Sequence, residues 1–220
     1  MSKTIIDNIS IFNTDCMEYM SNIPDNTFDL AVVDPPYGIN IGEKTKSFSA
    51  KKFMNGVNWD YNIPDKKYFN ELFRVSTNQI IWGANYFLEH LKATKCMIVW
   101  NKYNTNKGRF ADGEIAWTSF SSPTRIVTYE WLMWYQPDMK NKQERIHPTQ
   151  KPIQLYHWIL KTYAMPGLKI FDSHMGSGSL AIACMDYDYQ FFGCEINGEY
   201  FNGAKKRIIN HASQLKIGYS

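Results

Sequence analysis

The sequence predicts an α/β protein with one doubly wound, mostly parallel sheet of seven strands. Short apolar runs typical of buried strands alternate with longer stretches typical of helices, and this alternation indicates βαβ units. Polar residues follow directly after several runs, and open α/β sheets bind ligands at the carboxyl ends of their strands. The length of 220 residues and hydrophobic fraction of 44% suffice for one core. We therefore expect a single domain over residues 1–220.

Seven apolar runs are expected to form the strands, because each has the length and composition of a buried strand. They are residues 9–12, 30–33, 79–82, 96–100, 126–129, 168–171 and 190–194. The helices are expected at residues 16–23, 66–75, 153–164, 179–187 and 198–214. Two irregular insertions remain, at about 38–65 and 136–148, and structureless segments of that length are usually functional or mobile.

Composition and the first residues exclude several classes of protein. No run approaches about 18 apolar residues, so we expect no transmembrane helix and no membrane partner. Residues 1–7 lack the apolar segment of a signal peptide. The four cysteines form no C-x-x-C pair, so neither a zinc site nor a disulfide framework is indicated, and no metal is expected. Reduced, buried thiols fit a cytoplasmic protein.

The most informative motif is Asp34-Pro35-Pro36-Tyr37, which ends the apolar run 28–33. Two prolines fix the backbone and leave the Pro35 carbonyl and the Asp34 carboxylate as hydrogen-bond acceptors. Tyr37 adds a flat aromatic face. Acceptors beside a stacking surface suit a planar ring that carries an exocyclic amino group. An ordinary loop with two turn prolines could have the same four residues, so the motif needs support from the rest of the chain.

A glycine-bearing turn follows a later strand. Residues 171–179 read F-D-S-H-M-G-S-G-S and lead into a helix, and the next strand ends at Glu195. Glycines at such a turn let a ligand approach the backbone, and helix N-terminal amides favour anionic groups. Glu195 lies 17 positions after Gly178 and could hold ribose hydroxyls. The pattern G-x-G-x-x-G is incomplete because it lacks its third glycine, which disfavours NAD.

Two further segments bear on a ligand site. Residues 147–152 read H-P-T-Q-K-P and place an amide and a cation before an expected helix. On its chemistry alone this segment could be a plain helix boundary. Near the start of the chain, Asn13-Thr14-Asp15-Cys16 brings an acidic side chain directly after the first expected strand.

Together these segments resemble the amino-methyltransferases of DNA. Members of that family carry D-P-P-Y at the end of a strand, H-P-T-Q-K-P, a glycine turn that is commonly D-P-F-x-G-S-G-T, and G-D-C near the start. Here D-P-P-Y comes first and the glycine turn last, which resembles the circularly permuted β group; residues 80–87 and 110–117 extend the likeness. The resemblance covers roughly residues 9–209. It implies a Rossmann-like methyltransferase fold and S-adenosylmethionine as cofactor.

The resemblance also implies a role for each matching residue. The catalytic residues would be Asp34, Pro35, Pro36 and Tyr37. The cofactor-binding residues would be Asp15, Cys16, Asp34, Thr149, Gln150, Lys151, Asp172, Ser173, His174, Gly176, Ser177, Gly178, Glu195 and Ile196. Within this set, Thr149, Gln150 and Lys151 would contact the methionine part of the cofactor or its carboxylate. Ser173 and His174 depart from the usual Pro and Phe, and Asn13 replaces a Gly. Because an imidazole also offers a flat wall, we expect cofactor binding to survive.

The implied reaction is methyl transfer from S-adenosylmethionine to the exocyclic N6 of an adenine flipped out of DNA. Asp34 and the Pro35 carbonyl would accept the amino hydrogens. Cytosine N4 is the alternative substrate, but family members acting on cytosine more often carry S-P-P-Y. An inactive homologue that binds cofactor or DNA is a second alternative, suggested by His174 and by the short segment, about residues 136–146, that is available for target recognition. Methylation of a protein glutamine uses N-P-P-Y after the glycine turn, and both features differ here.

Basic residues in the irregular segments are candidates for phosphate contacts. The alternative is an ordinary solvated surface. The candidates are Lys44, Lys51, Lys52, Lys102, Lys107, Arg109, Lys142 and Arg145. DNA is therefore the expected partner, while a homodimer and a cognate restriction enzyme are left open by the sequence.

Overall fold

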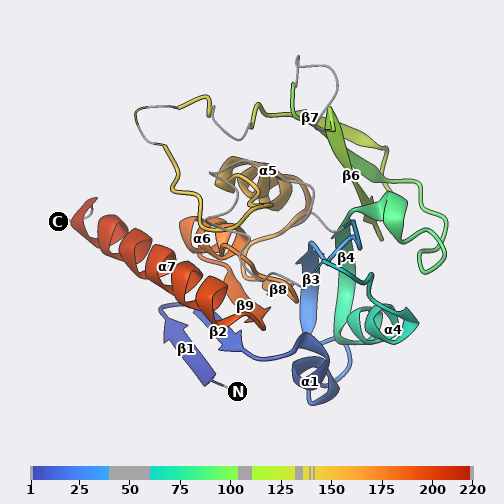
Figure 1. Ribbon diagram of the computed structural model, residues 1–220, viewed down its shortest axis with the longest axis horizontal. Coiled ribbons are helices and arrows are strands. Elements are labelled where there is room, and N and C mark those ends of the chain that lie inside the picture. The colour runs from blue at the N-terminus through green and yellow to red at the C-terminus, as the bar shows by residue number, and fades with distance from the viewer. Residues whose placement is uncertain are drawn as a thin grey trace.

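The computed structural model describes residues 2–39, 60–103, 111–131, 136–138, 140 and 142–218. Its strands are β1 (Ser2–Ile6), β2 (Ile9–Asn13), β3 (Phe28–Val33), β4 (Ser76–Trp82), β5 (Met97–Asn101), β6 (Gly113–Thr118), β7 (Arg125–Thr128), β8 (Lys169–Asp172) and β9 (Gln190–Glu195). Its helices are α1 (Cys16–Ser21), α4 (Lys66–Val75), the short 3-10 helix η1 (Ala84–Tyr86), α5 (Ile153–Tyr163), α6 (Ser179–Asp186) and α7 (Gly198–Gly218) (Figure 1).

The described strands form one sheet in the order β1-β2-β9-β8-β3-β4-β6-β5-β7. Strands β2, β9, β8, β3 and β4 are parallel neighbours, and β5 pairs in parallel with β7. Strand β1 is antiparallel to β2, and β6 runs antiparallel between β4 and β5. The predicted α/β class and the mostly parallel sheet are confirmed, whereas the predicted count of seven strands is wrong, because the sheet has nine.

The two strands that the sequence did not indicate are β1 and β6. Strand β1 lies at the sheet edge and is largely exposed, so it carries no continuous apolar run. Strand β6 begins with Gly113 and Glu114, two residue types that are depleted in strands. The other seven strands and all five α-helices lie where they were expected, to within a few residues at their ends.

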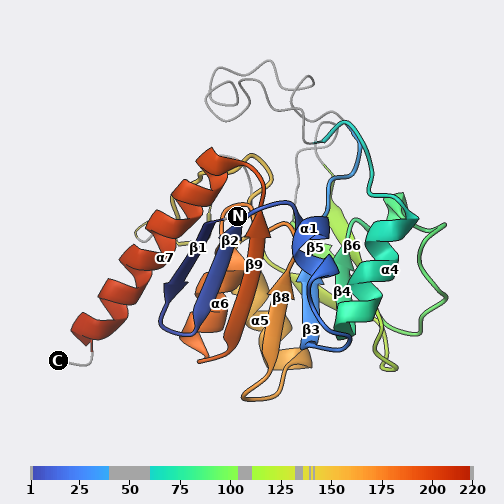
Figure 2. The ribbon, with the colours of Figure 1, turned by 90° about the horizontal axis from the view of Figure 1, so that it is seen from below.

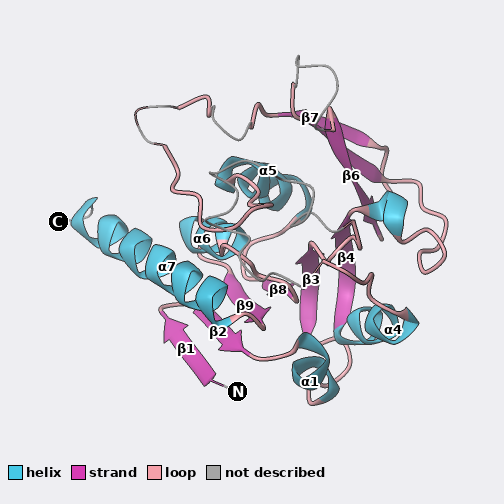
Figure 3. Cartoon of the chain, in the orientation of Figure 1, coloured by secondary structure: helices cyan, strands magenta, loops and turns pink. Residues whose placement is uncertain are grey.

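Helices cover both faces of the sheet, as Figures 2 and 3 show. Alternate residues of β3 point to opposite faces: Leu30 and Val32 join the core under α5, α6 and α7, while Ala31 and Val33 join the core under α1 and α4. This alternation explains why β3 reads as a continuous apolar run. Within the described part of the chain, no helix is both long enough and apolar enough to cross a membrane.

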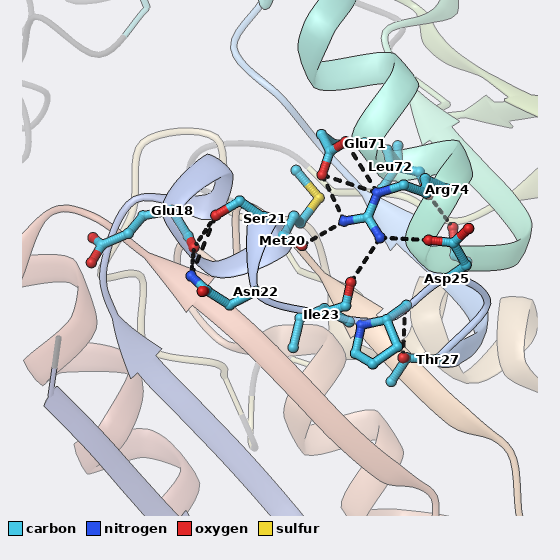
Figure 4. A network of polar contacts seen from close by, with 12 residues as sticks. Glu18, Met20, Ser21, Asn22, Ile23, Asp25, Thr27, Glu71, Leu72 and Arg74 are labelled. Atoms are coloured by element: carbon cyan, nitrogen blue, oxygen red, sulfur yellow. Dashed lines mark hydrogen bonds and ion pairs between the residues drawn. The ribbon is translucent and has the colours of Figure 1, made fainter.

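A single arginine ties α4 to the segment after α1 (Figure 4). Arg74 donates to the backbone carbonyl of Met20 at 2.8 Å and to that of Ile23, also at 2.8 Å. Its guanidinium also pairs with Asp25 and Glu71, each at 2.7 Å. The Ile23 carbonyl lies just beyond α1, and the Met20 carbonyl in its last turn also accepts from the Ile23 N–H, so the guanidinium adds a side-chain donor to the end of this helix. The network therefore fixes α1 against α4 before β3 begins.

Replacing Arg74 with Met should lower the free energy of unfolding by roughly 1–3 kcal/mol, because hydrogen bonds involving a charged group are lost. Urea denaturation checks this. Lys67→Met is the matched control: it removes a cation from the same helix at an exposed position and should change stability by less than about 0.5 kcal/mol. Equal effects of the two substitutions would show that the network contributes nothing.

Candidate active site

The candidate site lies at the edge of the sheet where the parallel strands end. Strands β2, β9, β8 and β3 are consecutive neighbours, so their carboxyl ends bring together residues that are far apart in sequence. Asp34 follows β3, Asp172 ends β8 and Glu195 ends β9. The sheet thus brings the D-P-P-Y motif and the glycine turn to one edge, as the sequence predicted.

Asp34 is held by two partners. The Tyr37 hydroxyl donates to Oδ1, and the Lys151 ammonium donates to Oδ2. The Lys151 side chain is only 3% exposed. Burial raises the pKa of Asp34, and the neighbouring Lys151 charge only partly offsets that rise. The carboxylate therefore lies in a largely dry environment with one direct cationic partner.

Tyr37 is fixed at its backbone, its hydroxyl and its ring. Its backbone N–H donates to Asp60 Oδ1 at 2.9 Å. Its ring stacks on Tyr86 of η1, with the centroids 4.9 Å apart and the planes at 14°. Gly83, with φ of 76°, lies against the same ring: a Cβ added there would come within 2.2 Å of Tyr37 Cε1. Gly83 is therefore required both by its backbone conformation and by the closeness of the tyrosine.

Lys151 joins Asp34 to a second carboxylate that the sequence analysis did not single out. Glu114 Oε2 lies 3.1 Å from Lys151 Nζ, and Glu114 Oε1 pairs with the ammonium of Lys102. We call these four residues the charged cluster: Lys102, Glu114, Lys151 and Asp34. The signal for Glu114 in the sequence was its place directly before the apolar run Ile115-Ala116-Trp117. Glu114 stands out in the sequence only as part of the stretch 110–117 that resembles the family.

The glycine turn is held by Glu195. The Gly176 N–H donates to Glu195 Oε2 at 2.8 Å, and the Asn197 N–H donates to Oε1 at 2.9 Å. Gly176 and Gly178 have φ of 51° and 73°, in the region that favours glycine. Nearby, burial raises the pKa of Asp172 to about 8. Burial also raises the pKa of Glu195.

The two unusual residues of the turn, Ser173 and His174, contact Tyr68 of α4. Ser173 Oγ lies 2.7 Å from the Tyr68 hydroxyl oxygen and 2.8 Å from His174 Nδ1. The His174 ring meets the Tyr68 ring edge-on, with 5.4 Å between centroids. Burial lowers the pKa of His174 to about 4, so its ring is neutral at pH 7. His174 Nε2 lies 4.0 Å from Cys16 Sγ.

Several other predicted cofactor residues make contacts within the protein. Asp15 caps α1 by accepting from the Met17 N–H at 2.7 Å. The buried Gln150 amide accepts from the Ile146 N–H at 3.1 Å and donates to the Glu144 carbonyl at 3.0 Å. The remaining positions are as follows: Thr149 Oγ1 lies 3.1 Å from His147 Nδ1, Ser177 Oγ lies 3.1 Å from Ser179 Oγ, and Ile196 is 63% exposed.

The basic residues expected to contact DNA occupy different environments. Lys102 belongs to the charged cluster. The Arg145 guanidinium lies 5.2 Å from the centre of the Trp131 ring, and Lys142 is exposed. The other candidates lie outside the described residues: Lys44, Lys51, Lys52, Lys107 and Arg109.

This chain is similar in sequence to a protein-family model and to several characterised proteins. A family model described as DNA methylase, of the N6_N4_Mtase type, matches residues 124–206. Type II methyltransferase M2.MboI of Moraxella bovis is 23% identical over 258 residues, with 95% of this chain and 90% of that protein covered. Type II methyltransferase M.HpaI of Haemophilus parainfluenzae is 21% identical over 232 residues, with 89% of this chain and 72% of that protein covered. The chain is thus similar to DNA methylases of the adenine-N6/cytosine-N4 type.

Solved structures show the same fold. The M1.HpyAVI-SAM complex matches with a TM-score of 0.58 and 23% identity, covering 90% of this chain and 99% of that one. The PvuII DNA methyltransferase, which is cytosine-N4-specific, matches with a TM-score of 0.59 and 12% identity. The match covers 94% of this chain and 92% of that one. The fold is therefore that of known methyltransferases.

The contact between Gly83 and Tyr37 can be tested by stability measurements. Gly83→Ala should cost roughly 1–3 kcal/mol, because the new methyl group overlaps the ring. Gly167→Ala is the matched control: Gly167 also has positive φ, at 84°, but nothing lies within 4 Å of its added Cβ. In a Tyr37→Ala background the two substitutions should cost the same. A Gly83→Ala penalty that persists in that background would place its cause elsewhere.

Proposed function

We propose that this chain is an S-adenosylmethionine-dependent DNA methyltransferase that methylates the exocyclic N6 of adenine. One observation carries the proposal: the half-buried Asp34 carboxylate at the end of β3 shares a sheet edge with the glycine turn and Glu195. The order of the motifs supports the circularly permuted β group. The family match and the curated relatives support the same activity.

The residues of the glycine turn fit the proposed cofactor. Gly176 carries no side chain over the turn, whereas Gly178 lets the turn pack against α7, since a Cβ there would come within 3.2 Å of the Ala204 Cβ. Glu195 ends β9 as a carboxylate acceptor for hydroxyl groups. The solved M1.HpyAVI complex contains SAM by its description, which supports this ligand. When bound, the cofactor supplies a methyl group activated by a positively charged sulfur.

Asp34 would make the amine of the base a better nucleophile. That nitrogen is a poor nucleophile because its lone pair is delocalised into the ring. The Asp34 carboxylate, with the Pro35 carbonyl, would accept the amino hydrogens and favour a pyramidal nitrogen with an available lone pair. Positive charge grows on the nitrogen in the transition state, so acceptors fixed beforehand stabilise it electrostatically. The partners of Asp34 in the folded protein supply that fixation.

The substrate base has to leave the double helix before it can reach Asp34, because its amino group is inaccessible inside the stack. Flipping costs a few kcal/mol. Tyr37 would recover part of this cost by stacking, since its ring is already held by Gly83 and Tyr86. Stacking on an aromatic side chain is worth roughly 1–3 kcal/mol per base.

Cytosine N4 is the second candidate acceptor. The PvuII DNA methyltransferase, which is cytosine-N4-specific, motivates it, and the fold is compatible with both bases. Asp34 favours adenine, because cytosine-specific members of the family more often carry serine at this position. Incubation with labelled S-adenosylmethionine and DNA, followed by nucleoside analysis, distinguishes the two: we expect N6-methyladenine, and N4-methylcytosine as the sole product would refute the assignment.

Asp34→Ala should reduce methyl transfer by roughly 100- to 1,000-fold, as losses of electrostatic catalytic groups do. Lys151 keeps Glu114 as a counter-ion in this variant, so the protein should still fold. Cofactor affinity, measured by calorimetry, serves as the internal control and should stay close to that of the wild type. Transfer within about tenfold of wild type would remove Asp34 from the reaction.

Glu195→Ala should weaken S-adenosylmethionine binding by roughly 10- to 150-fold, because hydrogen bonds to a charged group are worth about 1.5–3 kcal/mol. Glu199→Ala is the matched control, since Glu199 is an exposed carboxylate in the first turn of α7. Calorimetry on both variants, with circular dichroism to verify folding, makes the comparison. Unchanged affinity in a folded Glu195→Ala protein would mean that Glu195 holds only the turn.

A further inference from the structure

One ammonium group serves two carboxylates in the charged cluster. Lys151 donates to Asp34 Oδ2 and lies 3.1 Å from Glu114 Oε2. Glu114 has a second cation, Lys102, on its other oxygen. We propose that Glu114 is a positioning residue for the methyl-transfer reaction: by sharing Lys151, it keeps the Asp34 carboxylate from being fully neutralised and leaves it a strong acceptor for the substrate amine. The inference rests on the function proposed above.

The geometry makes the sharing unequal. The Lys151 side chain is 3% exposed, so water cannot screen its interactions with either carboxylate. The buried Glu114 Oε2 makes no hydrogen bond of good geometry to any described group, so the Lys151 charge is what stabilises it there. The Glu114 charge is thus balanced by two lysines, whereas Asp34 has one shared lysine.

The ionisable groups that face Asp34 act in both directions. Lys151 favours its ionised form, whereas Glu114 opposes it through like-charge repulsion. Burial and, to a smaller extent, the Asp34 charge raise the pKa of two buried tyrosines, Tyr68 of α4 and Tyr156 of α5. The same two causes raise the pKa of Asp172. Tyr37 donates to it directly. Removing the Glu114 charge leaves both direct partners of Asp34, Tyr37 and Lys151, in place.

The pKa values of the two carboxylates shift in opposite directions. Burial alone would raise the pKa of Glu114, but Lys151 and Lys102 together lower it to about 2. The pKa of Asp34 moves upward instead, because burial and the Glu114 charge outweigh Lys151. A more basic carboxylate is a better hydrogen-bond acceptor for a nitrogen that becomes positive. Glu114 would thereby strengthen the acceptor without touching the substrate.

Carboxyl-carbon NMR titration of the protein labelled at aspartate tests the inference directly. The Asp34 signal is identified by its loss in Asp34→Ala. In Glu114→Gln the pKa of Asp34 should fall by roughly one pH unit or more, because a like charge has been removed. In Lys151→Met it should rise. An Asp34 pKa that stays unchanged or rises in Glu114→Gln would overturn the proposal.

A second variant keeps the test decisive if Glu114→Gln fails to fold. Lys102 is 20% exposed and lies at the outer end of the cluster, so Lys102→Met should be tolerated. In this variant Glu114 keeps only Lys151 as a cationic partner. Lys151 then stabilises the Asp34 carboxylate less, so the Asp34 pKa should rise. A fall in the Lys102→Met protein would overturn the proposal equally.

The pH dependence of methyl transfer gives a readout that a merely structural role would not move. Asp34 has to be ionised to accept the amine, so the rate falls on the acidic side as Asp34 becomes protonated. In Glu114→Gln that acid limb should shift to lower pH, with a several-fold lower kcat on the plateau and an unchanged KM for the cofactor. Glu114→Asp should restore part of kcat. Glu89→Gln, at an exposed position, should match the wild type.

The two readouts separate failure of the inference from failure of the proposed function. If the wild-type protein transfers no methyl group to DNA, the proposed function is wrong, while the NMR titration still decides whether Glu114 sets the ionisation of Asp34. If the wild type is active and Asp34→Ala is not, but the acid limb of Glu114→Gln coincides with that of the wild type, only the role of Glu114 is refuted.

Discussion

The buried ammonium of Lys151 is the constraint on which the candidate site depends. Removing a charge from water costs several kcal/mol, and good pairing geometry is needed to repay it. Asp34 after β3 and Glu114 in β6 provide the compensating charges, and Lys151 itself precedes α5. Three segments that are distant in sequence must therefore meet correctly. Loss of both carboxylates would leave the Lys151 charge uncompensated, and breaking a buried pair in this way typically costs about 3–5 kcal/mol.

The sheet topology explains why Glu114 can take part at all. Parallel strands present their carboxyl ends at one edge, whereas an antiparallel strand presents its amino end there. Because β6 runs antiparallel between β4 and β5, its second residue pairs with Trp100 near the end of β5. Glu114 thus reaches the edge where Asp34 follows β3. A parallel strand at this place in the sheet would carry its second residue to the opposite edge.

The same topology marks the limit of what the sequence could predict. Asp34 and Glu195 were predicted at one edge because each follows or ends an apolar run whose direction is fixed by βαβ connections. Strand β6 offers no such signal, since Gly113 and Glu114 open it and its neighbours are set by long-range pairing. The motif around Gln150 was recognisable, but only the structure shows its amide bonded to the backbone at Ile146 and Glu144.

The edge divides into a half around the charged cluster and a half around the glycine turn, and this division suits a reaction between two bound molecules. Around Asp34 two lysines face two carboxylates, with Lys151 shared between Asp34 and Glu114. Around the glycine turn, burial lowers the pKa of His174 to about 4 and raises that of Asp172 to about 8, so both side chains are predominantly neutral at pH 7. Tyr68 connects the glycine turn to α4 through Ser173, and Arg74 anchors α4 to the chain just before β3. Each half is thus fixed before any ligand binds, and preorganisation of that kind lowers the entropy lost when two substrates are brought together.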